Sequence, residues 1–128
     1  MLLDTSAWIE YFKETELGLK VKKFIEEKPV VYTCPITLAE ISNWVYKNNE
    51  EPFPYIFKIK EISKIIELDE DMLVNAGKIY YQERIQKKNE KIGMIDCIIY
   101  SCANFHGLKL LTKDGDFGAL SDVELLKE

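Results

Sequence analysis

Apolar and polar positions along the chain follow two periods that alternate from one segment to the next. Compact apolar runs predict buried strands at residues 1–3, 30–33, 65–68, 108–111 and 123–126. Stripes with the period of an α-helix predict helices between them, at about residues 5–12, 17–27, 35–45, 51–63, 69–89 and 94–105. Strands that alternate with helices favour an α/β fold with a parallel sheet covered on both faces.

Residues with special backbone preferences mark where these elements begin. Thr5 or Ser6 is expected to cap the first helix, and Asp69 is expected to cap the fifth. Pro35 suits the first turn of the third helix. No internal repeat or Gly/Ser linker divides the chain, so we expect one domain spanning residues 1–128.

The composition is that of a globular protein, because 47% of the residues are hydrophobic and 30% are charged. No apolar run is long enough to span a bilayer. The N-terminal residues have neither a basic region nor an extended apolar run, so they do not resemble a signal peptide. We therefore expect a cytoplasmic protein without a membrane partner.

The three cysteines argue against a disulfide framework, because their number is odd. Cys97 and Cys102 lie in an apolar helical run, where cysteine usually packs as a small hydrophobic residue. Cys102 and His106 are spaced i, i+4, but Cys34 is remote and no CxxC pair exists. We therefore do not expect a zinc site.

The formal net charge of −5 does not suggest a nucleic-acid-binding protein. The positive charges are nevertheless uneven, with one group at Lys20, Lys22, Lys23 and Lys28 and a second at Lys78, Arg84, Lys87, Lys88 and Lys91. Either group also fits an ordinary solvated helix face. Bound divalent cations would reduce the negative charge of an acidic site.

Two carboxylates stand in apolar helical segments, where an unpaired charge is costly. Asp96 is the only charged residue between Gly93 and Ala103, and Glu40 is the only one between Ile36 and Val45. Asp96 also fits a first-turn acid satisfied by helix N–H groups. Glu40 also fits a side chain at the edge of the apolar stripe or paired with a lysine.

Three further acids lie where predicted strands end. Asp4 follows the first strand, and Asp114 and Asp116 flank Gly115 in the turn after the fourth predicted strand. Each also has a local interpretation, as a helix cap for Asp4 and as turn residues for the other two. However, α/β sheets place their sites outside the carboxyl ends of the strands, which brings such acids together.

Four or five carboxylates in one cleft would repel each other strongly unless cations were bound. An all-oxygen ligand set favours Mg²⁺ or Mn²⁺, and such a site suits in-line hydrolysis of a phosphodiester. A ribonuclease mechanism that uses two histidines is excluded, because His106 is the only histidine and sits where a helix ends.

Four motifs, in order along the chain, resemble those of PIN-domain proteins, especially the VapC toxins of toxin–antitoxin pairs. The motifs are Leu2-Leu3-Asp4-Thr5-Ser6-Ala7-Trp8-Ile9, Thr37-Leu38-Ala39-Glu40-Ile41, Ile92-Gly93-Met94-Ile95-Asp96-Cys97-Ile98-Ile99 and Leu110-Leu111-Thr112-Lys113-Asp114-Gly115-Asp116-Phe117. The likeness covers essentially the whole chain.

The resemblance implies a three-layer α/β/α sandwich around a mainly parallel sheet of four or five strands. It implies an endoribonuclease dependent on Mg²⁺ or Mn²⁺, with Asp4, Glu40, Asp96 and Asp114 as the acidic cluster. Asp4, Asp96 and Asp114 would hold metal, and Asp116 would be a further ligand or lie just behind the ligands. Thr5, Ser6 and Thr112 would orient carboxylates or waters. The family also implies a homodimer and a cognate antitoxin that occupies the active-site groove.

Three alternatives remain open at this stage. A receiver domain also has an acidic cluster and Mg²⁺, but its phosphoacceptor would be Asp69, which the pattern favours as a helix cap. A PIN fold without catalysis would serve as a binding module. A PIN-type nuclease without an antitoxin would use the same acids in RNA processing or on DNA.

Overall fold

The structure is a computed structural model that describes residues 1–128. The elements follow in the order β1 (Leu2–Leu3), α1 (Thr5–Lys13), α2 (Glu16–Glu27), β2 (Tyr32–Thr33), α3 (Pro35–Lys47), α4 (Phe53–Ile62), β3 (Lys64–Ile65), α5 (Glu70–Tyr81), the π-helix η1 (Gln82–Gln86), α6 (Met94–Phe105), β4 (Leu110–Thr112), the 3-10 helix η2 (Gly115–Phe117) and β5 (Val123–Leu125). None of the helices is long and apolar enough to cross a membrane.

The five strands form one parallel sheet in the order β3-β2-β1-β4-β5. The central pair is β1 and β4, which align Leu2 with Leu110 and Leu3 with Leu111. The chain builds outward from β1 in one direction through β2 and β3, and in the other through β4 and β5. The direction switches between β1 and β4, and α/β sheets bind ligands at the carboxyl ends of the strands at such a point.

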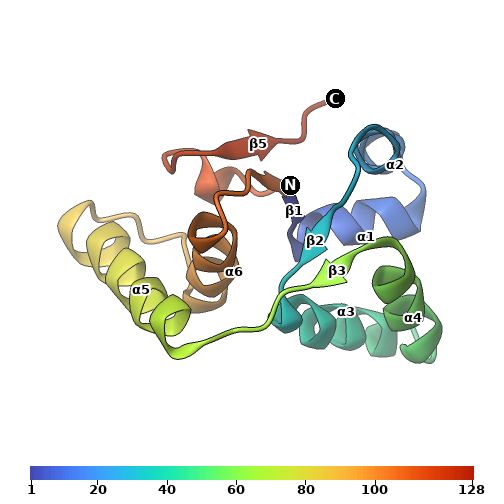
Figure 1. Ribbon diagram of the computed structural model, residues 1–128, viewed down its shortest axis with the longest axis horizontal. Helices are drawn as coiled ribbons and strands as arrows, with labels where there is room; N and C mark the ends of the chain where they lie inside the picture. Colours follow the sequence, from blue (N-terminus) through green and yellow to red (C-terminus); the bar gives the residue numbers. More distant parts are fainter.

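Two hydrophobic cores lie on the two faces of this sheet, because successive strand residues point in opposite directions. Leu2 and Leu110 belong to the core formed with α5 and α6. Leu3 and Leu111 belong to the other core, with α1 to α4. Figure 1 shows α5 and α6 to the left of β1, β2 and β3, and α1 to α4 on the other side. The predicted α/β sandwich with a parallel sheet is therefore confirmed.

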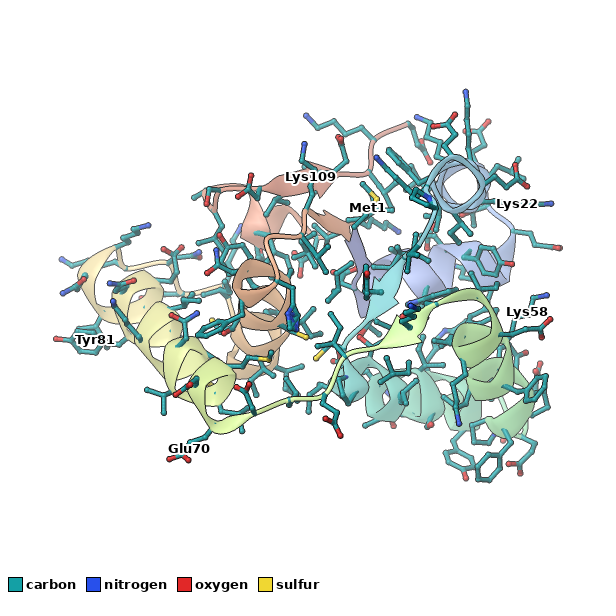
Figure 2. The ribbon with its side chains drawn as sticks, viewed as in Figure 1. Met1, Lys22, Lys58, Glu70, Tyr81 and Lys109 are labelled. Carbon is teal, nitrogen blue, oxygen red and sulfur yellow. The ribbon has the colours of Figure 1, made fainter.

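The outer surface of α5 carries apolar side chains that the two cores do not cover. Leu73, Val74, Tyr81 and, in η1, Ile85 are all exposed. Tyr81 extends away from α6, as does Glu70 at the start of the helix (Figure 2). Both faces of α5 are thus partly apolar, which is unusual for a helix that covers a sheet on one side only.

Two predicted helix boundaries were wrong. The cap of α1 is Asp4, not Thr5 or Ser6, because its carboxylate accepts a hydrogen bond from the Ala7 N–H at 2.9 Å. The fifth helix does not run to Asn89, since α5 ends at Tyr81 and η1 ends at Gln86. In that wider turn the Lys87 N–H bonds to the Gln82 carbonyl at 2.9 Å. The apolar period of the sequence does not distinguish such a turn from an α-helix.

The strands are shorter and shifted by one or two residues from their predicted positions. The second covers Tyr32–Thr33 rather than 30–33, the third Lys64–Ile65 rather than 65–68, the fourth Leu110–Thr112 rather than 108–111, and the fifth Val123–Leu125 rather than 123–126. Apolar runs mark buried segments, and pairing covers only part of each. Asp69 caps α5 as predicted, accepting from the Met72 N–H at 2.9 Å.

Gly18 allows the close packing of α2 against α1. A Cβ atom at this position would lie 2.0 Å from the Glu10 carbonyl oxygen, a backbone atom that cannot move aside. We expect Gly18→Ala to lower the free energy of unfolding by about 1–3 kcal/mol. Gly77 is the matched control, because a Cβ there meets nothing within 4 Å. Gly77→Ala should stabilise the protein by about 0.5–1 kcal/mol. Urea denaturation measures both, and equal stability of the two variants would refute the close approach.

Candidate active site

Asp4 lies directly after β1, and three donors from two segments hold its carboxylate. The Ser6 hydroxyl and the Ala7 N–H both donate to Oδ1, at 2.7 and 2.9 Å. The Thr112 hydroxyl at the end of β4 donates to Oδ2. The carboxylate therefore joins the ends of the two central strands and has a fixed orientation.

The side chain of Asp4 is also nearly closed to solvent, with only 4% of the residue exposed. Burial raises the pKa of Asp4 to about 6, although the three hydrogen bonds lower it, and the negative charge of Asp114 raises it further. Deprotonated Asp4 is consequently less stable in this fold than in water. A cation at this carboxylate would remove that penalty.

Asp96 lies in the first turn of α6 and is partly buried. Its Oδ2 accepts the N–H of Gly93 at 3.1 Å, so the helix-terminal interpretation describes part of its environment. Burial raises the pKa of Asp96, the hydrogen bond from Gly93 opposes the rise, and the charges of Asp114, Glu40 and Asp116 add to it. Asp114, Glu40 and Asp116 therefore all lie close enough to Asp96 to interact with its charge.

Glu40 on α3 is oriented by a residue of α1. The Thr5 hydroxyl donates to Glu40 Oε1 at 2.6 Å, and Thr5 Oγ1 also lies 3.1 Å from Thr37 Oγ1. Thr37 is completely buried one turn before Glu40. The side chain of Glu40 is thus fixed by α1 and points to the same edge of the sheet as Asp4.

Asp114 and Asp116 lie in the turn after β4. Asp114 caps η2 through Oδ1, which accepts the Asp116 N–H at 2.9 Å, and its own N–H donates to Thr112 Oγ1 at 2.9 Å. Burial, the charge of Asp114 and a hydrogen bond with Asp114 raise the pKa of Asp116, and Lys91 lowers it. The local turn interpretation is therefore correct for the backbone, and the two carboxylates also interact.

The five acids come from four separate parts of the chain, and none of them forms a salt bridge. The salt bridges in the structure join Lys13 and Lys113 to Glu10, and Lys87 to Glu83. An all-carboxylate set without cationic partners fits a hard divalent ion. The acids are neighbours rather than a formed ligand sphere, since no group of three or more Asp, Glu, His or Cys side chains is close enough to hold a metal ion as it stands.

A comparison with protein-family models decides the family of this chain, because the model of the PIN domain matches residues 1–123. The chain belongs to the PIN domain family. The resemblance inferred from the four motifs is therefore confirmed.

The relatives of this PIN domain include named ribonucleases. The chain is 26% identical to the VapC ribonuclease Mb1587 of Mycobacterium bovis, over 99% of this chain and 96% of that protein. It is 30% identical to ribonuclease VapC1 of Methanocaldococcus jannaschii, over 89% of this chain and 75% of that protein. Among solved structures it resembles a toxin–antitoxin complex from Klebsiella pneumoniae, with a TM-score of 0.77, 22% identity and coverage of 99% and 98%.

Three residues that surround the acids were missed in the sequence analysis. Thr37 contacts Thr5, while Glu10 and Lys113 form a salt bridge beside the turn that holds Asp114. Glu10 stands among apolar residues of the first helix, so the criterion that singled out Asp96 and Glu40 would also have found it. Thr37 carries no such signal, because a buried threonine is common in any core.

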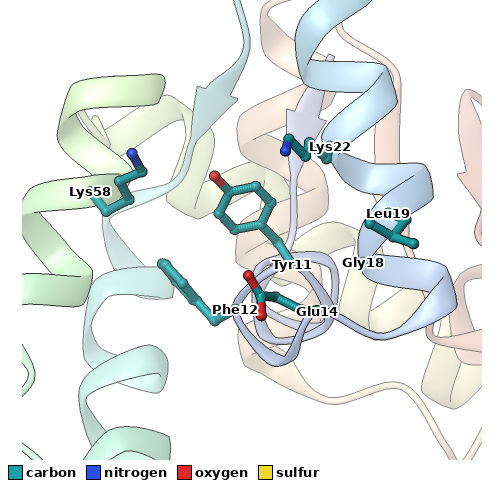
Figure 3. A pocket seen from close by; sticks show the side chains of 7 residues that line it. All are labelled: Tyr11, Phe12, Glu14, Gly18, Leu19, Lys22 and Lys58. Atoms are coloured by element: carbon teal, nitrogen blue, oxygen red, sulfur yellow. The ribbon is translucent and has the colours of Figure 1, made fainter.

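A separate pocket of about 470 Å³ lies between α1, α2 and α4 (Figure 3). Tyr11, Phe12 and Leu19 form its apolar part, and Lys22 and Lys58 stand across from each other above the tyrosine ring. Its lining residues do not include any of the five acids. The pocket belongs to the opposite end of α1 from Asp4 and is not part of the acidic site.

The raised pKa of Asp4 predicts how the metal-free protein responds to pH. Because the folded pKa of about 6 exceeds the ordinary aspartate pKa of 3.8, ionisation of Asp4 costs stability as pH rises through this window and costs nothing below it. At pH 8 the cost is about 3 kcal/mol. We therefore expect Asp4→Asn to be more stable than the wild type at pH 8 in EDTA, and this pH-dependent difference to vanish below about pH 3. Urea unfolding across this range measures it, and a pH-independent difference would contradict the assignment.

Proposed function

We propose that this PIN domain is an endoribonuclease that depends on Mg²⁺ or Mn²⁺. Asp4, Asp96 and Asp114 would hold the metal, with Glu40 and Asp116 completing the acidic site. One observation carries this proposal: Asp4 interacts with Asp114, Asp96 interacts with Asp114, Glu40 and Asp116, and none of these five carboxylates forms a salt bridge. A fold keeps such a costly group of like charges where a ligand compensates for it.

The side chains around the acids would prepare them for this role. Ser6 and Thr112 hold the carboxylate of Asp4 in one orientation, and Thr5 does the same for Glu40. A bound divalent cation lowers the pKa of water and stabilises the charge of a leaving oxygen. Because these hydroxyls fix the carboxylates before metal arrives, less ordering is required on binding.

RNA as the substrate is supported by two features. The relatives Mb1587 and VapC1 carry the name ribonuclease. In this chain, Lys91 lies near enough to Asp116 to lower its pKa, and Lys87 and Lys88 are exposed in the same segment. This basic segment would contact the phosphates of a strand whose scissile bond enters the acidic site.

Two protein partners belong to the same proposal. The structural likeness to a toxin–antitoxin complex supports a cognate antitoxin, and the pocket in Figure 3 would accept an apolar side chain next to a carboxylate that pairs with Lys22 or Lys58. A homodimer would bury the exposed apolar face of α5, where Leu73, Val74 and Tyr81 lie. The chain would then act as the toxin of a VapBC-type pair.

Purified protein should cleave RNA in Mg²⁺ or Mn²⁺ and not in EDTA. Asp96→Asn should reduce the rate by at least about 100-fold, because it removes a charge that binds the metal. Asp71→Asn is the matched control. Asp71 is likewise an acid in the first turn of a helix, but it is exposed and belongs to α5, which contributes none of the five acids. Gel assays on a panel of tRNAs and mRNAs measure cleavage, and full activity of Asp96→Asn would remove Asp96 from the mechanism.

A ribonuclease without its inhibitor degrades RNA that the cell needs. Expression of this chain alone in a bacterial host should therefore slow growth, whereas expression of Asp96→Asn should not. Growth curves at matched protein levels measure the effect. Equal growth of the two strains would refute the toxin role and leave the nuclease activity to the cleavage assay.

A further inference from the structure

Glu10 is a buried acid that the acidic site does not include. It lies on α1, and only 5% of the residue is exposed. Its Oε1 accepts the Thr15 hydroxyl at 2.9 Å. Its Oε2 lies 3.5 Å from Nζ of Lys113 and 3.8 Å from Nζ of Lys13. A carboxylate this deeply buried is retained only if its partners compensate for the loss of water.

Lys113 belongs to the turn that carries the acids after β4, and this turn is attached to α1 at three successive points. Thr112 donates to Asp4, the N–H of Lys113 donates to the Ser6 hydroxyl at 2.9 Å, and the ammonium group of Lys113 pairs with Glu10. The first two attachments are hydrogen bonds to Asp4 and Ser6, at the start of α1. The third is an ion pair, in which the side chain of Lys113 reaches Glu10 further along α1.

We propose that the ion pair between Glu10 and Lys113 is a positioning device that holds the turn of Asp114 and Asp116 against the other acids of the site. The proposal rests on the metal-binding role given above. Asp114 is close enough to Asp4 and Asp96 to be repelled by their charges, and no salt bridge in the structure involves any of these three acids. A tether on the residue next to Asp114 keeps the turn in place, so that a metal ion meets carboxylates already close together.

The direction in which metal affinity changes when Lys113 is replaced distinguishes positioning of the turn from a simple charge effect. Lys113→Met deletes a positive charge near an acidic site, and Coulomb's law alone predicts tighter binding of a cation. Loss of positioning predicts the opposite, because the turn would move away from Asp4 and Asp96. Weaker metal binding in Lys113→Met therefore cannot come from the charge itself.

Lys13 provides a closely matched control. It contacts the same oxygen of Glu10, and its side chain is 50% exposed, compared with 49% for Lys113. However, Lys13 lies in the last turn of α1 and is not part of the turn that carries Asp114 and Asp116. Lys13→Met thus removes the same charge from the same carboxylate without releasing the turn. Lys113→Arg keeps the charge and should preserve the tether.

The experiment compares wild type, Lys113→Met, Lys113→Arg and Lys13→Met in two measurements. Amide hydrogen exchange of residues 112–117 in metal-free protein reports the mobility of the turn, and electron paramagnetic resonance of free Mn²⁺ reports affinity. We expect Lys113→Met to exchange about 10-fold faster in this segment and to bind Mn²⁺ about 10-fold more weakly. Lys13→Met and Lys113→Arg should match the wild type in both.

Equal exchange in Lys113→Met and Lys13→Met would overturn the tether, whatever the metal result. Tighter Mn²⁺ binding in Lys113→Met would also overturn it, because the charge effect would then outweigh positioning. Failure of the wild type to bind Mn²⁺ would instead refute the proposed metal site, while hydrogen exchange would still decide whether Lys113 holds the turn. Glu10→Gln, checked for folding by circular dichroism, should reproduce the exchange of Lys113→Met.

Discussion

The carboxylate of Asp4 is held at the junction of the two central strands, almost without water and without a positive partner, and the arrangement around it follows from this constraint. Three hydrogen bonds orient the group, yet burial still raises its pKa to about 6. Hydrogen bonds therefore reduce the cost of the buried charge but do not cancel it. A cation bound at Asp4 would remove the remaining free-energy cost of ionising this carboxyl, and this gain would contribute to the affinity for the cation.

Hydroxyl groups from segments that are distant in sequence hold these carboxylates in place. Thr112 on β4 and Ser6 on α1 hold Asp4, while Thr5 on α1 holds Glu40 on α3. The segment from Asp4 to Ser6 thus contacts both neighbouring parts of the site. This is possible because β1 is the central strand, so that its carboxyl end adjoins the ends of β4 and β2. The parallel topology brings the acids together, and the hydroxyl groups fix their orientation.

The sequence predicts the layers of this fold better than its details. Asp96 and Glu40 are predicted because each is a lone charge in an apolar segment, and in the structure Asp96 interacts with Glu40, Asp114 and Asp116. The turn at η1 was not predicted, because its apolar spacing is also that of an α-helix. Thr37 was missed because its contact with Thr5 joins two helices that are distant in sequence. Periodicity describes which side of an element is buried, whereas these contacts depend on which segments meet.

The acidity of the chain, which appeared to disfavour a nucleic-acid substrate, has a local origin. The protein contains 17 Lys and Arg against 22 Asp and Glu, for a net charge of −5. Setting aside the five acids of the candidate site leaves 17 acids against 17 bases, so the rest of the chain is neutral in total. The five acids of the candidate site thus equal in number the excess of acidic over basic residues. Metal binding would neutralise the charge of the five acids, and Lys88 and Lys91 would then meet a phosphate backbone beside a less negative site.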